Sequence, residues 1–396
     1  MKRAKKSAVS PVGRGFVRVL GNERSQNVTI PLFAILLSII ACAIVIALFH
    51  KNPFTTLVCF LQGSGVLPKP GYAAHQGQLA DFMGMINALT PMIFAALAVA
   101  VALKTGLFNI GVSGQMLAAG FVTSVLIGYS KLPMGAALPL VLLVGVVVGG
   151  AVGALIGWLK HRFNINEVVS SIMLNYIIQY LVSFLINQYY INMVSRQSNP
   201  VSAASRLTLM NVSAFGLNID IPLGILLAIP AAFLVRFLLD KTRLGYELKV
   251  VGLNRRAAKY AGINVGRSMV TSMLLSGALA GLAGVTYYLG TFNSIQPRTL
   301  TSVGFDSIAV CLLGNANPIG ILFSSLLITV ISKGSNYMSS IMNIPQEISQ
   351  VITGLILLFS ACGAYIKYRV AQTKEQLLDE AHILRQPAEN EGGEKL

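Results

Sequence analysis

Residues 134 to 159 form an unbroken run of apolar and small side chains without a single charge. A run of about 20 such residues is long enough for a helix to cross the hydrocarbon core of a bilayer. Similar runs recur along the chain, and they are continuous rather than alternating, which argues against a transmembrane β-barrel. Only 11% of the residues are charged, against about 25% in soluble domains. The sequence therefore predicts an all-α protein that crosses a membrane several times.

Hydropathy predicts about ten transmembrane helices. Their expected positions are near residues 30–49, 84–103, 115–130, 134–159, 168–191, 219–239, 268–290, 304–314, 318–333 and 348–366. If these spans alternate from a cytoplasmic N-terminus, 22 of the 30 Lys and Arg residues fall inside and seven, including Arg196 and Arg298, fall outside. Cytoplasmic loops are enriched in these residues, so both termini are predicted to be cytoplasmic. The net charge of +16 then requires no nucleic acid to explain it.

This organisation divides the chain into three regions. Residues 1–29 form a basic cytoplasmic leader, residues 30–366 form the transmembrane domain, and residues 367–396 form a polar cytoplasmic tail. The apolar run from Ile30 to Phe49 is longer than a signal-peptide core, and no small-residue cleavage site follows it. We therefore expect it to remain as the first span.

Helix packing is predicted by a glycine stripe in the run 134–159. Its glycines recur every fourth residue, at Gly145, Gly149, Gly153 and Gly157. Such spacing lets two membrane helices approach closely. A shorter stripe, at Gly277, Gly281 and Gly284, lies on the span 268–290.

The run "GLFNIGVSGQM" (106–116) interrupts two apolar segments with Asn109, Ser113 and Gln115. Backbone without regular structure cannot face lipid, so this break lies at the surface or inside the protein. It is either a tight structural turn or a lining of a transport pathway. Asn175 raises the same question, because a buried amide requires partners. It either joins helices or faces a pore, whereas Asn166 is expected to cap the helix that carries it.

The loop 240–267 is basic, long and predicted to contain a short helical segment, Arg255–Gly262. Its charge obeys the positive-inside rule, but a small helix between two spans can also contact a cytoplasmic partner. There is no Gly-Lys dipeptide, so the chain has no Walker A phosphate loop. The Cys and His residues are scattered, and no catalytic or metal-binding cluster is expected. Carboxylates outside the tail fall at segment ends or in loops, which disfavours ion-coupled transport.

Four stretches together resemble the membrane permeases of bacterial ATP-binding-cassette importers. They are "GLFNIGVSGQM" (106–116), "NEVVSSIMLNY" (166–176), the run 245–284 that contains "NRRAAKYAG", and "LLGNANPIG" (312–320). The likeness is to the branch that carries simple sugars and nucleosides, which is related more distantly to branched-chain amino-acid permeases. It implies a type II-like importer fold in a bacterial cytoplasmic membrane.

The resemblance also implies a role for the cytoplasmic loop. Permeases of this kind carry an Ala-Ala-x-x-x-Gly element that forms a coupling helix and docks on the ATPase. The element and its flanks correspond here to Asn254, Arg255, Arg256, Ala257, Ala258, Lys259 and Gly262. Family members often have an acidic residue where this chain has Ser113, so no charged role is expected at that position.

The expected function is passage of a nucleoside, or a related simple sugar, through a pore formed with a second permease subunit, either homologous or identical. The resemblance implies that separate ATPase subunits bind ATP, that this chain needs no cofactor, and that an extracytoplasmic binding protein delivers the solute. Asn109, Ser113, Gln115 and Asn175 are the candidate pathway residues. Two alternatives stay open: an ion-coupled secondary transporter, and a membrane scaffold that only recruits a partner through residues 240–267.

Overall fold

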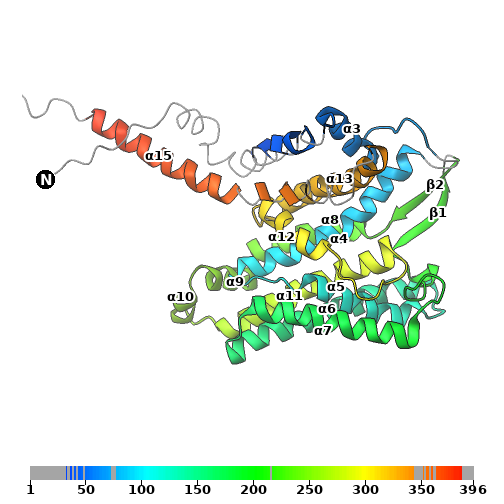
Figure 1. Cartoon of the computed structure of the whole chain (residues 1–396). Helices are drawn as coiled ribbons and strands as arrows, with labels where there is room; N and C mark the ends of the chain where they lie inside the picture. Colours follow the sequence, from blue (N-terminus) through cyan, green and yellow to red (C-terminus); the bar gives the residue numbers. More distant parts are fainter. Residues whose placement is uncertain are drawn as a thin grey trace, which may run out of the picture.

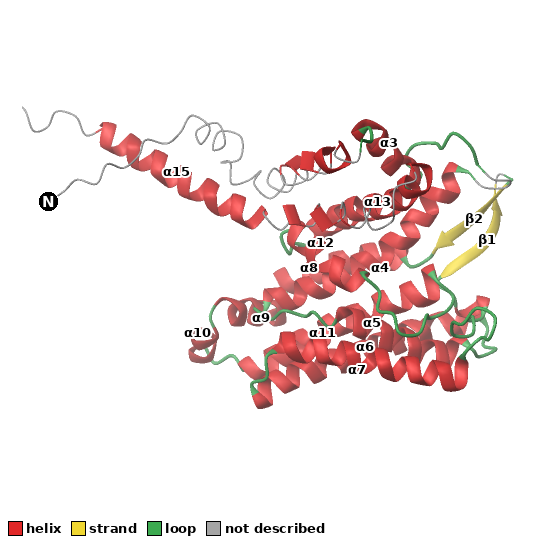
Figure 2. Cartoon of the chain, in the orientation of Figure 1, coloured by secondary structure: helices red, strands yellow, loops and turns green. Residues whose placement is uncertain are grey.

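The computed structural model describes residues 50–72, 77–214, 216–342 and 363–385, together with scattered positions between 33 and 47 and between 351 and 359. The predicted span 30–49 and most of the predicted span 348–366 therefore lie outside the described residues. The described part is mostly helical, as Figure 2 shows.

Five described helices are long and apolar enough to cross a membrane. They are α4 (Gln78–Lys104), α6 (Met134–Phe163), α7 (Glu167–Leu185, continued by a π-helical turn to Tyr190), α11 (Val265–Thr286, continued likewise to Thr291) and α13 (Pro318–Met342). Two shorter apolar helices accompany them, α5 (Val112–Thr123, continued to Gly128) and α12 (Val303–Leu313). Each of these seven helices overlaps a predicted span.

The remaining described elements lie near the ends of these helices or beside them. They are α3 (Pro53–Gly63), a 3-10 turn (Ala203–Ser205), α8 (Ile225–Lys241), α9 (Arg243–Leu253), α10 (Arg255–Tyr260), α15 (Gly363–Arg385) and the strands β1 (Thr208–Ala214) and β2 (Leu217–Pro222). In Figure 1, α10 stands at one end of the bundle and the two strands stand at the other.

The antiparallel β1–β2 hairpin corrects the all-helical prediction locally. The predicted span 219–239 begins inside β2, and the helix itself, α8, begins only at Ile225. The reason is local: Leu217 to Ile221 alternate apolar and polar side chains, a period of two that suits a strand. Gly216 adopts φ +75° in the connecting turn, a conformation that favours glycine.

Helix α4 is the centre of the bundle. Every residue from Leu89 to Ala102 is buried, and the helix contacts α5, α8, α11, α12 and α13. A helix that is apolar on all sides is stable only where neighbouring helices or lipid surround it. Here the neighbours are other helices, which makes α4 the axis around which the remaining elements are arranged.

The glycine stripe on α6 packs against α11, where Gly149 and Gly153 meet Gly277 and Gly281. The third glycine of the α11 stripe, Gly284, lies against Met116 of α5 instead. A Cβ atom added at Gly149 would overlap the carbonyl oxygen of Gly277 and lie 2.6 Å from the Cα of Gly281. The two backbones are therefore in direct contact. Gly150, on an adjacent side of α6, has no atom closer than 3.6 Å to the equivalent position.

We expect Gly149→Ala to lower the thermal stability of the protein in detergent, because the added methyl group separates two helices that pack through their backbones. Overpacking of this kind costs about 1–3 kcal/mol. Gly150→Ala is the matched control: its methyl group has room, and alanine favours a helix by up to about 1 kcal/mol. Equal melting temperatures for the two variants would contradict the close packing.

Candidate functional site

The break between α4 and α5 folds into the protein and is held there by Asn109. Its amide Nδ2 donates to Gln115 Oε1 at 3.0 Å and to Ser276 Oγ on α11 at 2.8 Å, while its Oδ1 accepts from the Gly111 N–H at 2.9 Å. A break at this position would otherwise leave backbone groups without partners. The amide-bearing, glycine-rich composition of the run is thus explained by hydrogen bonding inside the bundle.

Asn175 holds the same break from α7. Its Oδ1 accepts from the Gly114 N–H in the first turn of α5 at 2.9 Å, and its Nδ2 donates to the Ile110 carbonyl at 3.1 Å. Ser113 Oγ donates to the Thr301 carbonyl, just before α12, at 3.0 Å. The start of α5 therefore joins α7, α11 and the segment that leads into α12.

The structure brings the four candidate pathway residues, Asn109, Ser113, Gln115 and Asn175, into one cluster around the start of α5. Each is at most 2% exposed. In this conformation their side chains bond to the protein, so they join helices rather than face an open route.

The predicted coupling segment is the short helix α10. Asn254 caps it, and its side-chain Oδ1 accepts from the N–H groups of Arg256 at 2.9 Å and Ala257 at 3.1 Å. This cap explains why the helix begins at residue 255. Gly262 lies just beyond the helix at φ +77°, where a side chain would strain the backbone. The predicted helical segment is confirmed.

Within this segment, Ala258 and its neighbours have different surroundings. Ala258 is fully buried and packs in a cluster with Leu107, Ile156 and Val251. Its small side chain therefore allows close packing against other residues of this chain, not against a partner. The exposed residues around it are Arg256, Ala257, Lys259, Leu253 and Tyr260, of which Leu253 is 87% and Tyr260 94% exposed.

Sequence reasoning did not single out Leu253 and Tyr260. The signal that could have found them is two large apolar side chains near the two ends of a short, otherwise polar helix in a basic loop. Large apolar groups that protrude singly are common on protein surfaces. Leu253 lies just before the α10 cap and Tyr260 is the last residue of α10, and this helix stands at one end of the bundle (Figure 1), which makes these two notable.

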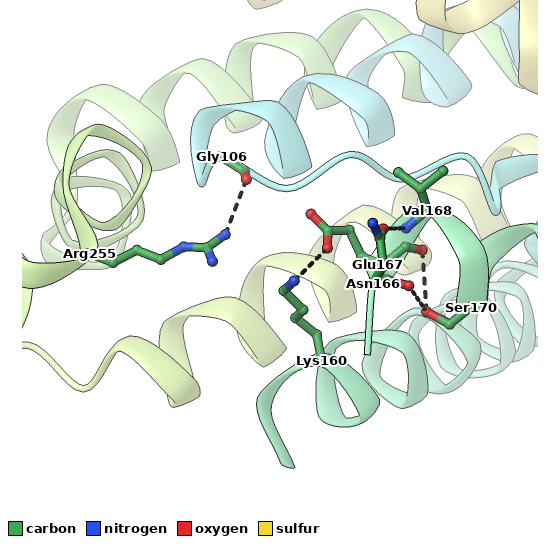
Figure 3. Close-up of polar contacts among 7 residues, drawn as sticks. All are labelled: Gly106, Lys160, Asn166, Glu167, Val168, Ser170 and Arg255. Carbon is green, nitrogen blue, oxygen red and sulfur yellow. Dashed lines mark hydrogen bonds and ion pairs between the residues drawn. The ribbon is translucent and has the colours of Figure 1, made fainter. Parts of the chain in front are cut away.

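The coupling segment is attached to the α4–α5 break. Arg255 Nη2 donates to the Gly106 carbonyl at 3.4 Å, as Figure 3 shows. Gly252 lies against the same loop, since a Cβ atom there would overlap the Lys104 carbonyl. Gly106 itself adopts φ +68°. A displacement of α10 therefore acts on the loop that Asn109 and Asn175 connect to the transmembrane helices.

The turn between α6 and α7 lies beside this attachment (Figure 3). Lys160 Nζ is 3.0 Å from Glu167 Oε2, and both side chains are mostly buried. Asn166 caps α7 by accepting from the Val168 N–H at 2.9 Å, as predicted. The ion pair and the cap together hold α7 at a fixed angle to α6.

Helix α9, which precedes α10, is also tied to α8. Lys249 Nζ lies 2.6 Å from Asp240 Oδ1. This hydrogen bond from Lys249 holds the pKa of the Asp240 carboxyl below its usual value. The pair is half-exposed, so its contribution to stability is modest, but it sets the direction in which α9 leaves α8.

Residues 82–361 match the family described as "Branched-chain amino acid transport system / permease component". The chain belongs to this family. Two curated relatives match the permease along most of its length. The nucleoside ABC transporter permease protein NupB of Lactococcus lactis is 34% identical, covering 91% of this chain and 98% of the relative. The guanosine ABC transporter permease protein NupP of Bacillus subtilis is 33% identical, covering 89% and 99%.

A third relative is named for a different solute. The glucose ABC transporter permease protein TsgB13 of Haloferax volcanii is 29% identical to this permease, covering 77% of this chain and 81% of the relative. The family match and these relatives identify the chain as a transporter subunit and not an enzyme.

We expect Asn175→Ala to destabilise the permease, because it leaves the Gly114 N–H and the Ile110 carbonyl buried without this partner. Each such loss costs about 1–3 kcal/mol. Met173→Ala, on the exposed face of the same helix, is the matched control and should change the melting temperature little. A normal melting temperature for Asn175→Ala, together with weaker solute binding, would instead support a direct contact with solute.

Proposed function

We propose that this permease is the membrane subunit of an importer that carries nucleosides across a bacterial cytoplasmic membrane. The observation that carries the proposal is the match with two permeases named for nucleosides or guanosine along about nine-tenths of the chain. The glucose-named relative keeps a related simple sugar as the second candidate solute.

The proposed complex contains three kinds of partner. A second permease subunit, homologous or identical, completes the pore; cytoplasmic ATP-binding-cassette subunits bind and hydrolyse ATP; and an extracytoplasmic binding protein delivers the solute. Permeases of this family are components of transport systems, and this chain has no Gly-Lys dipeptide with which to build its own phosphate loop. It follows that the driving force comes from another polypeptide.

The proposed topology has about ten spans with both termini in the cytoplasm. It is supported by the excess of Lys and Arg in the segments assigned to the inside. The arrangement of α10 and α15 also supports it, because both stand towards the same end of the bundle in Figure 1. In this topology the regions 1–29 and 367–396 flank the transmembrane domain on its cytoplasmic side, and α15 continues across the boundary at residue 367.

The proposed contact with the ATPase is the exposed surface around α10. Leu253 and Tyr260 supply apolar area, while Arg256 and Lys259 supply positive charge. Aromatic side chains are frequent energetic centres of protein interfaces, and the basic residues favour a partner surface with carboxylates. Asn254, Arg255, Ala258 and Gly262 shape this helix and attach it to the bundle.

Asn109, Ser113, Gln115 and Asn175 have a positioning role in this proposal. They connect α10, through the break at residues 105–111, to helices α5, α7 and α11. When the ATPase subunits close, movement of α10 would be passed on to these helices as a rigid-body change. The four residues would then shape the pathway without lining it in the present conformation.

The function is tested with the complete complex reconstituted in proteoliposomes. We expect nucleoside to stimulate ATP hydrolysis and to accumulate in the lumen only when ATP is supplied. Accumulation without ATP that an ionophore abolishes would favour an ion-coupled transporter. Recruitment of the ATPase with no solute flux of any kind would favour a scaffold.

We expect Tyr260→Ala to weaken retention of the ATPase subunits about tenfold, which corresponds to about 1.4 kcal/mol of binding free energy. The reason is loss of an exposed aromatic contact, so the melting temperature of the isolated permease should not change. Tyr189→Ala, an exposed tyrosine on α7 near its distal end, is the control. Ala258→Trp should behave differently and unfold the permease at lower temperature, because Ala258 is buried within this chain.

A further inference from the structure

The connection between α11 and α12, residues 292–302, contains neither helix nor strand and runs along α7. The Arg298 N–H donates to Ser183 Oγ at 2.7 Å, and the Arg298 carbonyl accepts from Gln179 Nε2 at 2.7 Å. Further along, the Thr301 carbonyl accepts from Ser113. This connection is part of the yellow trace that crosses the bundle in Figure 1.

Its contact with α7 places Arg298 deep in the membrane. The apolar span from Glu167 to Tyr190 has 24 residues, which makes it about 36 Å long, against about 30 Å for the hydrocarbon core. Gln179 stands midway along this span. Arg298, which the sequence places in an outer connection, therefore lies near the level of the bilayer centre.

Backbone without regular structure is tolerated at this depth only where protein buries it or where it lines a water-filled space. Along this connection the side chains of Gln296, Arg298, Thr299 and Ser302 are exposed, so the described part of the chain does not bury them. Lipid is an unfavourable neighbour for an arginine and for such polar groups. The remaining surroundings are water, solute and the second permease subunit.

The backbone of Arg298 has an uncommon conformation. Its φ is +61°, in the left-handed region that residues other than glycine seldom occupy. Both of its backbone polar groups are bound by α7, which holds this conformation in place. Such positions cluster at functional sites. Among the described residues, the guanidinium has no hydrogen bond or ion pair.

The neighbouring part of α7 adds two exposed aromatic rings, and inside the protein it holds an amide oxygen that no described residue binds. Gln179 Oε1 is buried without a hydrogen-bond partner among the described residues. Tyr176 and Tyr180, one helical turn apart, are 52% and 64% exposed and lie beside Gln179 and Ser183 on the helix surface. Tyrosines in membrane helices prefer the two interfaces, so two exposed at mid-span are unusual for a lipid-facing surface.

We propose that Arg298, Tyr176 and Tyr180 form a solute-binding site midway across the membrane, on the face that this subunit turns towards the second permease subunit. Gln179 positions Arg298 by binding its backbone carbonyl. The inference rests on the proposed function for the identity of the solute. Arginine offers only hydrogen-bond donors, so it selects the carbonyl and ring-nitrogen acceptors of a base or the oxygens of a ribose. The tyrosine rings provide stacking surfaces for a planar base. The ligand class is a neutral nucleoside.

The aqueous setting is tested by cysteine accessibility in the complete complex, with Cys42, Cys59, Cys311 and Cys362 replaced by alanine. We expect a membrane-impermeant maleimide to label Thr299→Cys, and guanosine in excess to slow the labelling at least threefold. Leu234→Cys, an exposed apolar position on α8, is the lipid-facing control and should stay unlabelled. Failure to label Thr299→Cys would overturn the proposal, as would labelling that guanosine does not slow.

The role of Arg298 is tested by uptake kinetics. We expect Arg298→Gln to raise the KM for guanosine about tenfold with a smaller effect on the maximal rate, and Arg298→Lys to restore part of the difference. Arg196→Gln is matched in backbone conformation, at φ +53°, but lies in the loop that follows α7, and it should keep the wild-type KM. An unchanged KM in Arg298→Gln, or loss of the second permease subunit from the purified complex, would assign Arg298 to subunit contact and overturn the proposal.

Different outcomes of these experiments bear on the proposed function and on the proposed binding site. If the wild-type complex fails to carry nucleosides, the proposed function fails. If it carries them while both Arg298 variants and Thr299→Cys behave like the controls, the binding site alone is wrong.

Discussion

The structure depends on one constraint: backbone polar groups inside a membrane protein must be satisfied by the protein itself. Two segments of this chain, residues 105–111 and 292–302, leave regular structure beside the membrane helices. Helix α7 binds both of them through amides one turn apart. Asn175 holds the first segment and Gln179 holds the second. These amides therefore supply backbone partners to both segments from the same helix.

The same constraint connects the α10 end of the bundle to its interior. The loop that Asn109 and Asn175 hold is also the loop that Arg255 and Gly252 contact from the side of α10. A series of hydrogen bonds and backbone contacts therefore connects α10 to α5, α7 and α11. Close glycine packing between α6 and α11 makes this connection stiff, since these two helices cannot slide past each other without steric overlap.

The two segments differ in what they leave exposed. Around residues 105–111, the polar side chain of Asn109 forms hydrogen bonds within the bundle. Around residues 292–302, the backbone is hydrogen-bonded at several positions, Ile295, Arg298 and Thr301 among them, while the Arg298 side chain stays exposed. The first segment is suited to passing on movement, and the second is suited to meeting a solute. This difference could not be read from composition, because both segments are short, polar and flanked by apolar helices.

Local patterns in the sequence determined the membrane class, the positions of the seven apolar helices described, the glycine stripes and the cap at Asn166. Each of these depends on neighbours within a few residues, so periodicity and side-chain chemistry are sufficient. Tertiary structure alone decided that Ala258 faces inward and that Asn175 reaches Gly114, 61 residues away. It also decided that the Arg298 carbonyl meets the Gln179 amide, 119 residues away in the sequence. The physical reason is that depth and burial are set by which helices pack together, and a residue's local pattern carries no record of its distant partners.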